Sequence, residues 1–255
     1  MNIIVPIKHV PDLVEELEIN EDGTDLNRDA VKYKINEFDD HALEEALQLK
    51  AEAGGTVTVL ALDGDETDKM LYTAIAKGAD KGVKITGDFS GRVASHVAAK
   101  AMANAIGSMP YDLILTGVQA VDDRDGQMGV LLANYLGVPH VSVVTGVKAE
   151  GKKVVVNKEY SGGMMAEFEV DLPAVLGIQA ARETPRYVAV SRVRQVTKEA
   201  SLEEVEAGDV AIEVGSNVRR MMKPEKGTRA EMIEGNPEEI ADKIIALMKE
   251  KGLKK

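Results

Sequence analysis

The stretch DLILTGVQAVDDRDGQMGVLLANYLG, residues 112–137, decides the fold class of this chain. It opens with the apolar run 113–115, which predicts a buried strand, and Gly117 ends that run. A polar, acidic loop follows over 119–126, and leucines then recur at helical spacing until the terminating Gly137. A helix that begins directly after such a loop offers unpaired N–H groups and the positive end of its dipole. The order of strand, loop and helix therefore predicts a phosphate-binding site.

Composition narrows the class of protein. The chain has 255 residues, which is enough for one large α/β domain or for one domain and an extended arm. Its net charge of −12 argues against general nucleic-acid binding, which needs clustered basic residues. The absence of cysteine excludes disulfides, zinc–thiolate sites and cysteine-bound iron–sulfur clusters within this chain.

Targeting signals are not evident in the sequence. The N-terminal MNIIVPIKHV is too short and too soon polar for a secretory leader, and no apolar stretch approaches the length of a membrane span. We therefore expect a cytoplasmic protein without membrane insertion and without a nucleic-acid partner.

Apolar runs alternate with helical patterns over the first 144 residues. Strands are predicted over 2–8, 57–62, 81–85, 113–115 and 141–144, helices over 36–54, 67–77, 91–106 and 127–136, and a turn at Asp22-Gly23. This alternation predicts a doubly wound, mostly parallel α/β sheet of the adenine nucleotide alpha-hydrolase-like kind. Ligands of such sheets bind beyond the carboxyl ends of the strands, so we expect the loops after Lys8, Leu62 and Thr116 to be neighbours.

The pattern changes after Val147. Segments 148–156 and 166–170 alternate like antiparallel strands joined through 160–163, and 174–178 predicts a further strand. Beyond Thr197 the chain is charged and weakly periodic until the sequence Asn-Pro-Glu-Glu at 236–239, which predicts a helix start. We expect a nucleotide-binding α/β domain over 1–197, and over 198–255 an extended arm and C-terminal helix that dock on a partner subunit.

Five motifs in a fixed order identify a resemblance. They are VPIKHVPD at 5–12, INEFDDHALEEALQLK at 35–50, AIAKGADKGV at 74–83, LTGVQAVDDRDGQMG at 115–129 and TPRY at 184–187. From Asn2 to about Val196 the chain resembles the β subunit of electron transfer flavoprotein. Each motif is weak alone, but their order and spacing together are specific.

The resemblance implies an electron carrier rather than an enzyme. In that family a β subunit pairs with an α subunit that holds most of an FAD, and the β subunit completes that site. The β subunit also binds AMP, or a second FAD in the electron-bifurcating members. The heterodimer shuttles electrons from flavin dehydrogenases toward a quinone oxidoreductase.

The resemblance also implies site residues. Those of the nucleotide site are Pro6, Asn36, Phe38, Asp39, Leu62, Gly117, Gln119, Val121, Asp122, Asp123, Gly126, Gln127, Met128 and Gly129. Asp122 or Asp123 would accept hydrogen bonds from ribose, and the amides of Gln127, Met128 and Gly129 would bind phosphate. Contacts to the shared FAD are expected near Pro11, Asp12 and Leu13, and partner recognition at Arg182, Glu183, Pro185 and Tyr187.

Three departures from the family pattern matter. The loop DDRDGQ at 122–127 differs from the DGDTAQ-like string of bifurcating members, which favours AMP over a second FAD. Glu37 replaces the proline of the family's NPF, which relaxes a turn. Arg182 stands where the family has a leucine anchor, so we expect an acidic or hydrogen-bonding pocket in a different partner.

Simpler interpretations stay open at this point. Asp122, Asp123 and Asp125 suit a solvated, helix-capping loop, and they also suit a Mg²⁺ or Ca²⁺ site. Asn36 suits a helix cap as well as a ligand. Two other functions share the predicted architecture, an adenine-nucleotide hydrolase and a nucleotide-sensing module. The sequence shows no P-loop lysine and no evident nucleophile for the hydrolase.

Overall fold

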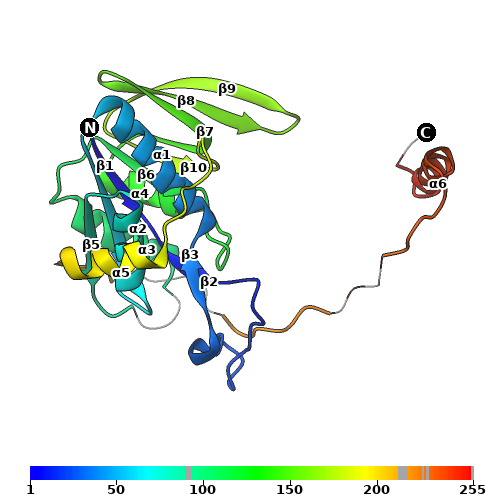
Figure 1. Cartoon of the computed structure of the whole chain (residues 1–255), viewed down its shortest axis with the longest axis horizontal. Coiled ribbons are helices and arrows are strands. Elements are labelled where there is room, and N and C mark those ends of the chain that lie inside the picture. Colours follow the sequence, from blue (N-terminus) through cyan, green and yellow to red (C-terminus); the bar gives the residue numbers. More distant parts are fainter. Residues whose placement is uncertain (90–92, 212–217, 226, 228–229, 254–255) are drawn as a thin grey trace. The chain divides into compact units, whose positions relative to one another are not determined.

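The computed structural model describes the chain except for residues 90–92, 212–217, 226, 228–229 and 254–255 (Figure 1). The chain divides into two compact units, Met1–Met221 and Met222–Lys255. Among the described residues, the first unit carries the sheets and most of the helices, and the second carries one helix.

The strands all belong to the first unit. They are β1 (Asn2–Pro6), β2 (His9–Pro11), β3 (Tyr33–Ile35), β4 (Thr56–Leu62), β5 (Lys81–Thr86), β6 (Leu113–Gly117), β7 (His140–Glu150), β8 (Lys153–Tyr160), β9 (Met164–Asp171), β10 (Ala174–Ile178) and β11 (Glu203–Glu206). Within the described residues, nine of them form one sheet in the order β11-β5-β4-β1-β6-β10-β7-β8-β9. Pairing is parallel from β11 to β7 and antiparallel from β7 to β9, and β2 pairs with β3 in a separate ribbon.

Helices cover both faces of this sheet. The helices of the described residues are η1 (Arg28–Ala30), α1 (Glu37–Ala53), α2 (Thr67–Lys77), α3 (Ser95–Ile106), α4 (Met128–Leu136), α5 (Val190–Glu199) and, in the second unit, α6 (Pro237–Glu250). The apolar sides of α1 and α2 pack on one face, and those of α3 and α4 pack on the other. The predicted doubly wound, mostly parallel sheet with an antiparallel extension is confirmed.

Strand β1 shows why the sequence is apolar almost without interruption here. Ile3 and Val5 join the core beneath α1 and α2, and Ile4 joins the core beneath α3 and α4. All three side chains are at most 2% exposed. A parallel strand that is covered on both faces has no polar side to show, so an apolar run replaces the alternating pattern.

The order in which the chain adds strands to the sheet reverses beside β1. From β1 the chain passes to β4 and β5 on one side and then returns to β6 on the other side. The loops that leave β1 and β6 therefore diverge and open a crevice at the carboxyl ends of the strands. This crevice positions the site described below.

The predicted strand 148–156 is wrong. Strand β7 runs on to Glu150, and a turn with Gly151 at φ +66° separates it from β8. The strand predicted over 141–144 is the first part of the same β7. A bulge at Val143, with φ +63°, lies where β7 changes from pairing with β10 to pairing with β8. The apolar alternation continues through the turn, so the pattern alone did not reveal it.

Other differences concern short elements. The ribbon β2–β3, helix α5 and strand β11 were not predicted. Helix α3 begins at Ser95, and the predicted start at Gly91 lies outside the described residues. Strand β11 pairs with β5, so the sheet of the first unit continues past Thr197. The docking of segment 198–255 on a partner stays a prediction.

The second unit contains the predicted C-terminal helix. Its start is marked by a capping box, in which the side chain of Asn236 accepts a hydrogen bond from the N–H of Glu239 at 3.0 Å. In return, the carboxylate of Glu239 accepts the N–H of Asn236 at 3.2 Å. The predicted start at Asn236 and Pro237 is confirmed. Over the described part of the chain, no helix is long and apolar enough to cross a membrane.

Candidate nucleotide-binding site

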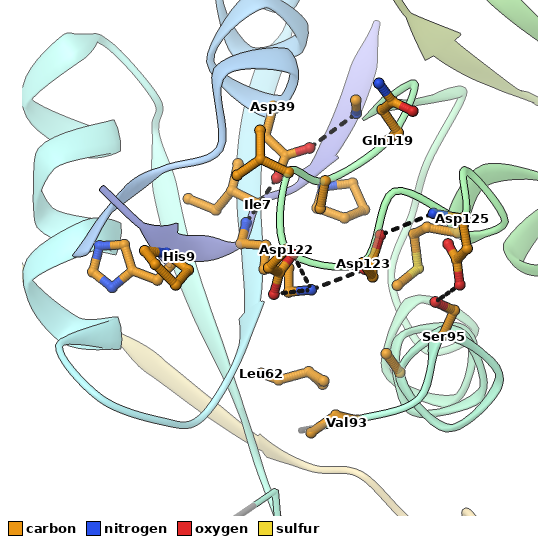
Figure 2. Close-up of a pocket in the computed structure, with 18 of the residues that line it drawn as sticks. Ile7, His9, Asp39, Leu62, Val93, Ser95, Gln119, Asp122, Asp123 and Asp125 are labelled. Atoms are coloured by element: carbon orange, nitrogen blue, oxygen red, sulfur yellow. Dashed lines mark hydrogen bonds and ion pairs between the residues drawn. The ribbon is translucent and has the colours of Figure 1, made fainter. Parts of the chain in front are cut away.

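A cavity of about 520 Å³ lies beyond the carboxyl ends of β1, β4 and β6 (Figure 2). Pro6, Leu62 and Gly117, the last residues of these three strands, all line it. The volume falls in the range of small-molecule and cofactor sites. The three loops that the sequence placed together therefore do meet around one cavity.

Most of the predicted nucleotide residues line this cavity. They are Pro6, Asp39, Leu62, Gly117, Gln119, Val121, Asp122, Asp123, Gly126, Gln127 and Met128. Asn36, Phe38 and Gly129 are outside the lining. Of the residues expected near the shared FAD, Pro11 and Leu13 line the cavity, while Asp12 pairs with Lys34 at 3.1 Å.

Asp39, in the first turn of α1, ties the ends of two strands together. Its carboxylate accepts the N–H of Lys8 at 2.9 Å and the N–H of Gly117 at 3.1 Å. The carboxyl group is buried, and burial raises its pKa to about 7 although both N–H groups and Asn36 oppose the shift. This side chain therefore fixes the spacing of β1 and β6 where the crevice opens.

The side chain of Asn36 does not act as a helix cap, and contact with a ligand stays a prediction. Asn36 occupies the N-cap position of α1. Its Nδ2 donates to the carbonyl of Gln119 at 2.9 Å, so it anchors the loop after β6. Its Oδ1 is buried and has no partner in the described structure.

Lys8 closes one side of the cavity. Its Nζ contacts Asp122 at 2.8 Å and Asp123 at 3.0 Å, which joins the loop after β1 to the loop after β6 (Figure 2). Burial opposes the charge of Lys8, but the two carboxylates outweigh it and hold the pKa of the amine above its ordinary value. Asp122 and Asp123, the expected acceptors for ribose, are thus engaged by Lys8 in this structure.

Asp125 supports the helix-capping interpretation of the acidic loop. One carboxylate oxygen accepts the N–H of Gln127, the residue before α4, at 3.1 Å. The other accepts the hydroxyl of Ser95, the first residue of α3, at 2.7 Å (Figure 2). Among the described residues, no group of three or more acidic, histidine or cysteine side chains is arranged to hold a metal ion.

Gly129 lies against two buried polar side chains. The hydroxyl of Thr116 and the Nε2 of His140 are both buried without a partner in the described structure. A Cβ atom at Gly129 would come within 2.9 Å of each. The role of this glycine in the structure is therefore close packing of α4 on β6 and β7.

Several cavity residues were not predicted. Lys8 and His9 are part of the first motif, but nothing in the motif indicated that Lys8 reaches the loop after β6 or that Nδ1 of His9 lies 3.2 Å from the carbonyl of Asp65 in the loop after β4. His9 and Tyr33 stack with ring centroids 6.0 Å apart. With Leu17 and Leu26, Tyr33 extends the cavity beyond the acidic loop. Contacts between β1, the β2–β3 ribbon and the acidic loop are long-range, so no local pattern signals them.

The predicted partner-recognition segment is held against α1. The guanidinium of Arg182 contacts the buried carboxylate of Glu45 at 2.9 Å and Glu52 at 2.8 Å. Glu45 also accepts the N–H groups of Val147 and Arg182. The guanidinium of Arg182 is therefore engaged within this chain, and the predicted acidic or hydrogen-bonding pocket in a partner stays a prediction.

Arg186 makes a second attachment to the same helix. Its guanidinium contacts Glu44 through two nitrogens, each at 2.8 Å, and its N–H adds a third bond at 3.1 Å. Burial alone would raise the pKa of Glu44, but Arg186 holds it below its ordinary value. Between the two arginines Glu183 is exposed, Pro185 is half-buried, and the ring of Tyr187 beyond them is 87% exposed.

Comparison with known proteins agrees with this geometry. The family model described as electron transfer flavoprotein domain matches residues 24–210. The mostly parallel sheet with a cavity at its switch point is an α/β architecture, and the chain belongs to the electron transfer flavoprotein family. The name of the family implies flavin-related electron transfer.

The similar proteins carry related names. The electron transfer flavoprotein subunit beta of Methylophilus methylotrophus is 37% identical over 262 residues, covering 98% of each chain. That of Thermoanaerobacterium thermosaccharolyticum is 32% identical, covering 84% of this chain and 81% of its own. The acryloyl-CoA reductase electron transfer subunit gamma of Anaerotignum propionicum is 35% identical, covering 76% and 74%.

We predict that Gly117→Ala destabilises the first unit by about 2–3 kcal/mol, as overpacking does. The new Cβ atom would lie 2.4 Å from Oδ1 of Asp39 and 2.8 Å from Cβ of Phe38. The check is urea denaturation followed by circular dichroism. Gly64→Ala is the control, since its Cβ meets nothing closer than 3.8 Å. Equal stability of both variants would contradict the close approach of Asp39.

We predict that Asp39 makes the chain less stable as the pH rises from about 4 to 7. The folded-state pKa of about 7 exceeds the unfolded value, so the native state binds the extra proton over this interval. The slope from one proton is at most about 1.4 kcal/mol per pH unit. Urea denaturation of wild type and Asp39→Asn at several pH values measures it. A difference between them that does not change with pH would refute the prediction.

We predict that Arg182→Ala lowers stability by about 2–3 kcal/mol, because it leaves the buried carboxylate of Glu45 without its cation. Arg192→Ala on α5 serves as the control, since Arg192 is exposed; its effect should stay within about 0.5 kcal/mol. Thermal denaturation compares the two. Similar melting temperatures for both variants would show that the attachment to α1 contributes little.

Proposed function

We propose that this chain is the β subunit of a heterodimeric electron transfer flavoprotein, that its cavity binds AMP, and that it completes the FAD site of an α subunit. The observation that carries the proposal is the cavity at the switch point beside β1, lined by the loops after three parallel strands. Relatives that match nearly the whole chain and bear the name subunit beta support the pairing with an α subunit.

The residues present fit an adenine nucleotide. The first N–H groups of α4 lack partners within their helix and suit a phosphate. Asp122 and Asp123 can accept bonds from ribose hydroxyls if Lys8 exchanges partners. Pro6 and Leu62 supply apolar contact at the strand ends.

The electron-transfer role follows from the same proposal. The FAD shared with the α subunit would supply the redox chemistry, and this chain would position it through the loop after β1. Pro11 and Leu13 lie there, and the side chain of Leu13 is 59% exposed. We propose that the complex accepts electrons from flavin dehydrogenases and passes them toward a quinone oxidoreductase. Exposed Glu183 and Tyr187, on the segment that the two arginines attach to α1, would contact these partners.

A second candidate is a β subunit that holds its own FAD. The lining of the cavity also includes Leu17, Leu26 and Tyr33, apolar or aromatic side chains that a ligand larger than AMP would contact. The loop DDRDGQ favours AMP, and these additional side chains favour the dinucleotide. Counting the flavins in the complex separates the two candidates.

The test is co-expression with an α subunit, followed by denaturation of the purified complex and identification of the released nucleotides. We expect one AMP and one FAD per heterodimer. Leu62→Glu should release the AMP while the FAD remains, because the new carboxylate would place a charge in the cavity of this chain alone. Two FAD molecules per heterodimer would establish the second candidate, and a complex without flavin would refute both.

A further inference from the structure

Asp125 lies in the cavity lining where α3 and α4 begin. Its carboxylate accepts the N–H of Gln127 at 3.1 Å, where α4 begins, and the hydroxyl of Ser95 at 2.7 Å, where α3 begins. Asp125 is one of the residues that line the cavity. A ligand phosphate at the start of α4 would use the same kind of N–H donor. The carboxylate and the phosphate therefore compete for one place.

The charges around this place disfavour a second anion. Lys8 is paired with two carboxylates, those of Asp122 and Asp123, so this group already has a net negative charge. Asp125 forms no ion pair within the described residues and is stabilised by a hydroxyl, an amide and the positive ends of two helices. A phosphate would add negative charge a few ångströms from an unneutralised carboxylate.

From these contacts we infer that Asp125 is a specificity-determining residue of the cavity, which weakens the binding of phosphorylated ligands relative to the nucleoside. The inference rests on the proposed function in that it takes the cavity to bind an adenine nucleotide. AMP then binds only when the Asp125 carboxylate leaves the N–H of Gln127, and the ligand is released more readily than from a cavity with a neutral residue here.

Asp125→Asn isolates the charge from the shape. The amide keeps an oxygen that can accept from Gln127 and an NH₂ group that can bond to Ser95, so both contacts can persist. Asparagine is also a good residue at a helix start. Asp125→Ser keeps a hydroxyl oxygen as a shorter acceptor, and it replaces Asp125→Asn in the experiment if the asparagine variant does not fold. Asp171→Asn, on β9, changes the net charge equally at an exposed position outside the cavity.

The experiment measures dissociation constants of the full-length chain, freed of bound nucleotide, for adenosine, AMP and inorganic phosphate by calorimetry. We expect Asp125→Asn to bind AMP about tenfold more tightly than wild type, since removal of a nearby like charge favours the phosphate. Adenosine affinity should change less than about twofold, and Asp171→Asn should behave as wild type. A purely structural role of Asp125 would change adenosine and AMP affinities together.

Two results would overturn the inference. One is equal AMP affinity in wild type and Asp125→Asn, and the other is a gain that adenosine or Asp171→Asn shares. If none of the proteins binds adenosine or AMP, the proposed function fails, and inorganic phosphate then decides the inference by itself. Tighter phosphate binding by Asp125→Asn would support it, and unchanged phosphate binding would refute it.

Discussion

The carboxylate of Asp39 is the constraint on which the cavity depends. It accepts the N–H groups that follow β1 and end β6, from a position at the start of α1. These strands are neighbours at the point where the strand order reverses, so the loops that follow them lead to opposite sides. The two hydrogen bonds to Asp39 hold the starts of these loops together. A buried carboxyl group costs free energy when it is charged, which is the physical reason for its raised pKa. The geometry of the site is thus maintained against a cost in stability.

Charged side chains also hold together the loops and helix starts that surround the cavity. Lys8 joins two loops through Asp122 and Asp123, and Asp125 joins the starts of α3 and α4. The contacts of Lys8 and of Ser95 connect segments that are far apart in the sequence, and together these side chains shape an acidic cavity in a chain of net charge −12. The affinity of such a cavity for an anion depends on how readily its own carboxylates give up their donors.

Ion pairs also hold the segment between β10 and α5 in place. Arg182 and Arg186 attach it to three carboxylates of α1, two of them buried, and leave the ring of Tyr187 exposed. Arg182, which replaces an apolar residue of the family pattern, thus has its ion-pair partners within its own chain. The buried carboxylate of Glu45 needs a nearby cation, and this requirement explains why the guanidinium of Arg182 lies against α1.

The sequence by itself determined the doubly wound sheet, the helix that begins after Asn236 and the meeting of three strand-end loops. These features follow from local periodicity, from capping residues and from the rule that parallel strands end at one edge. It did not reveal the turn at Gly151, strand β11, or the pairings of Lys8 and Arg182. Only the tertiary structure decided these, because β11 and its neighbour β5, and Arg182 and Glu45, are more than a hundred residues apart and become partners through folding alone.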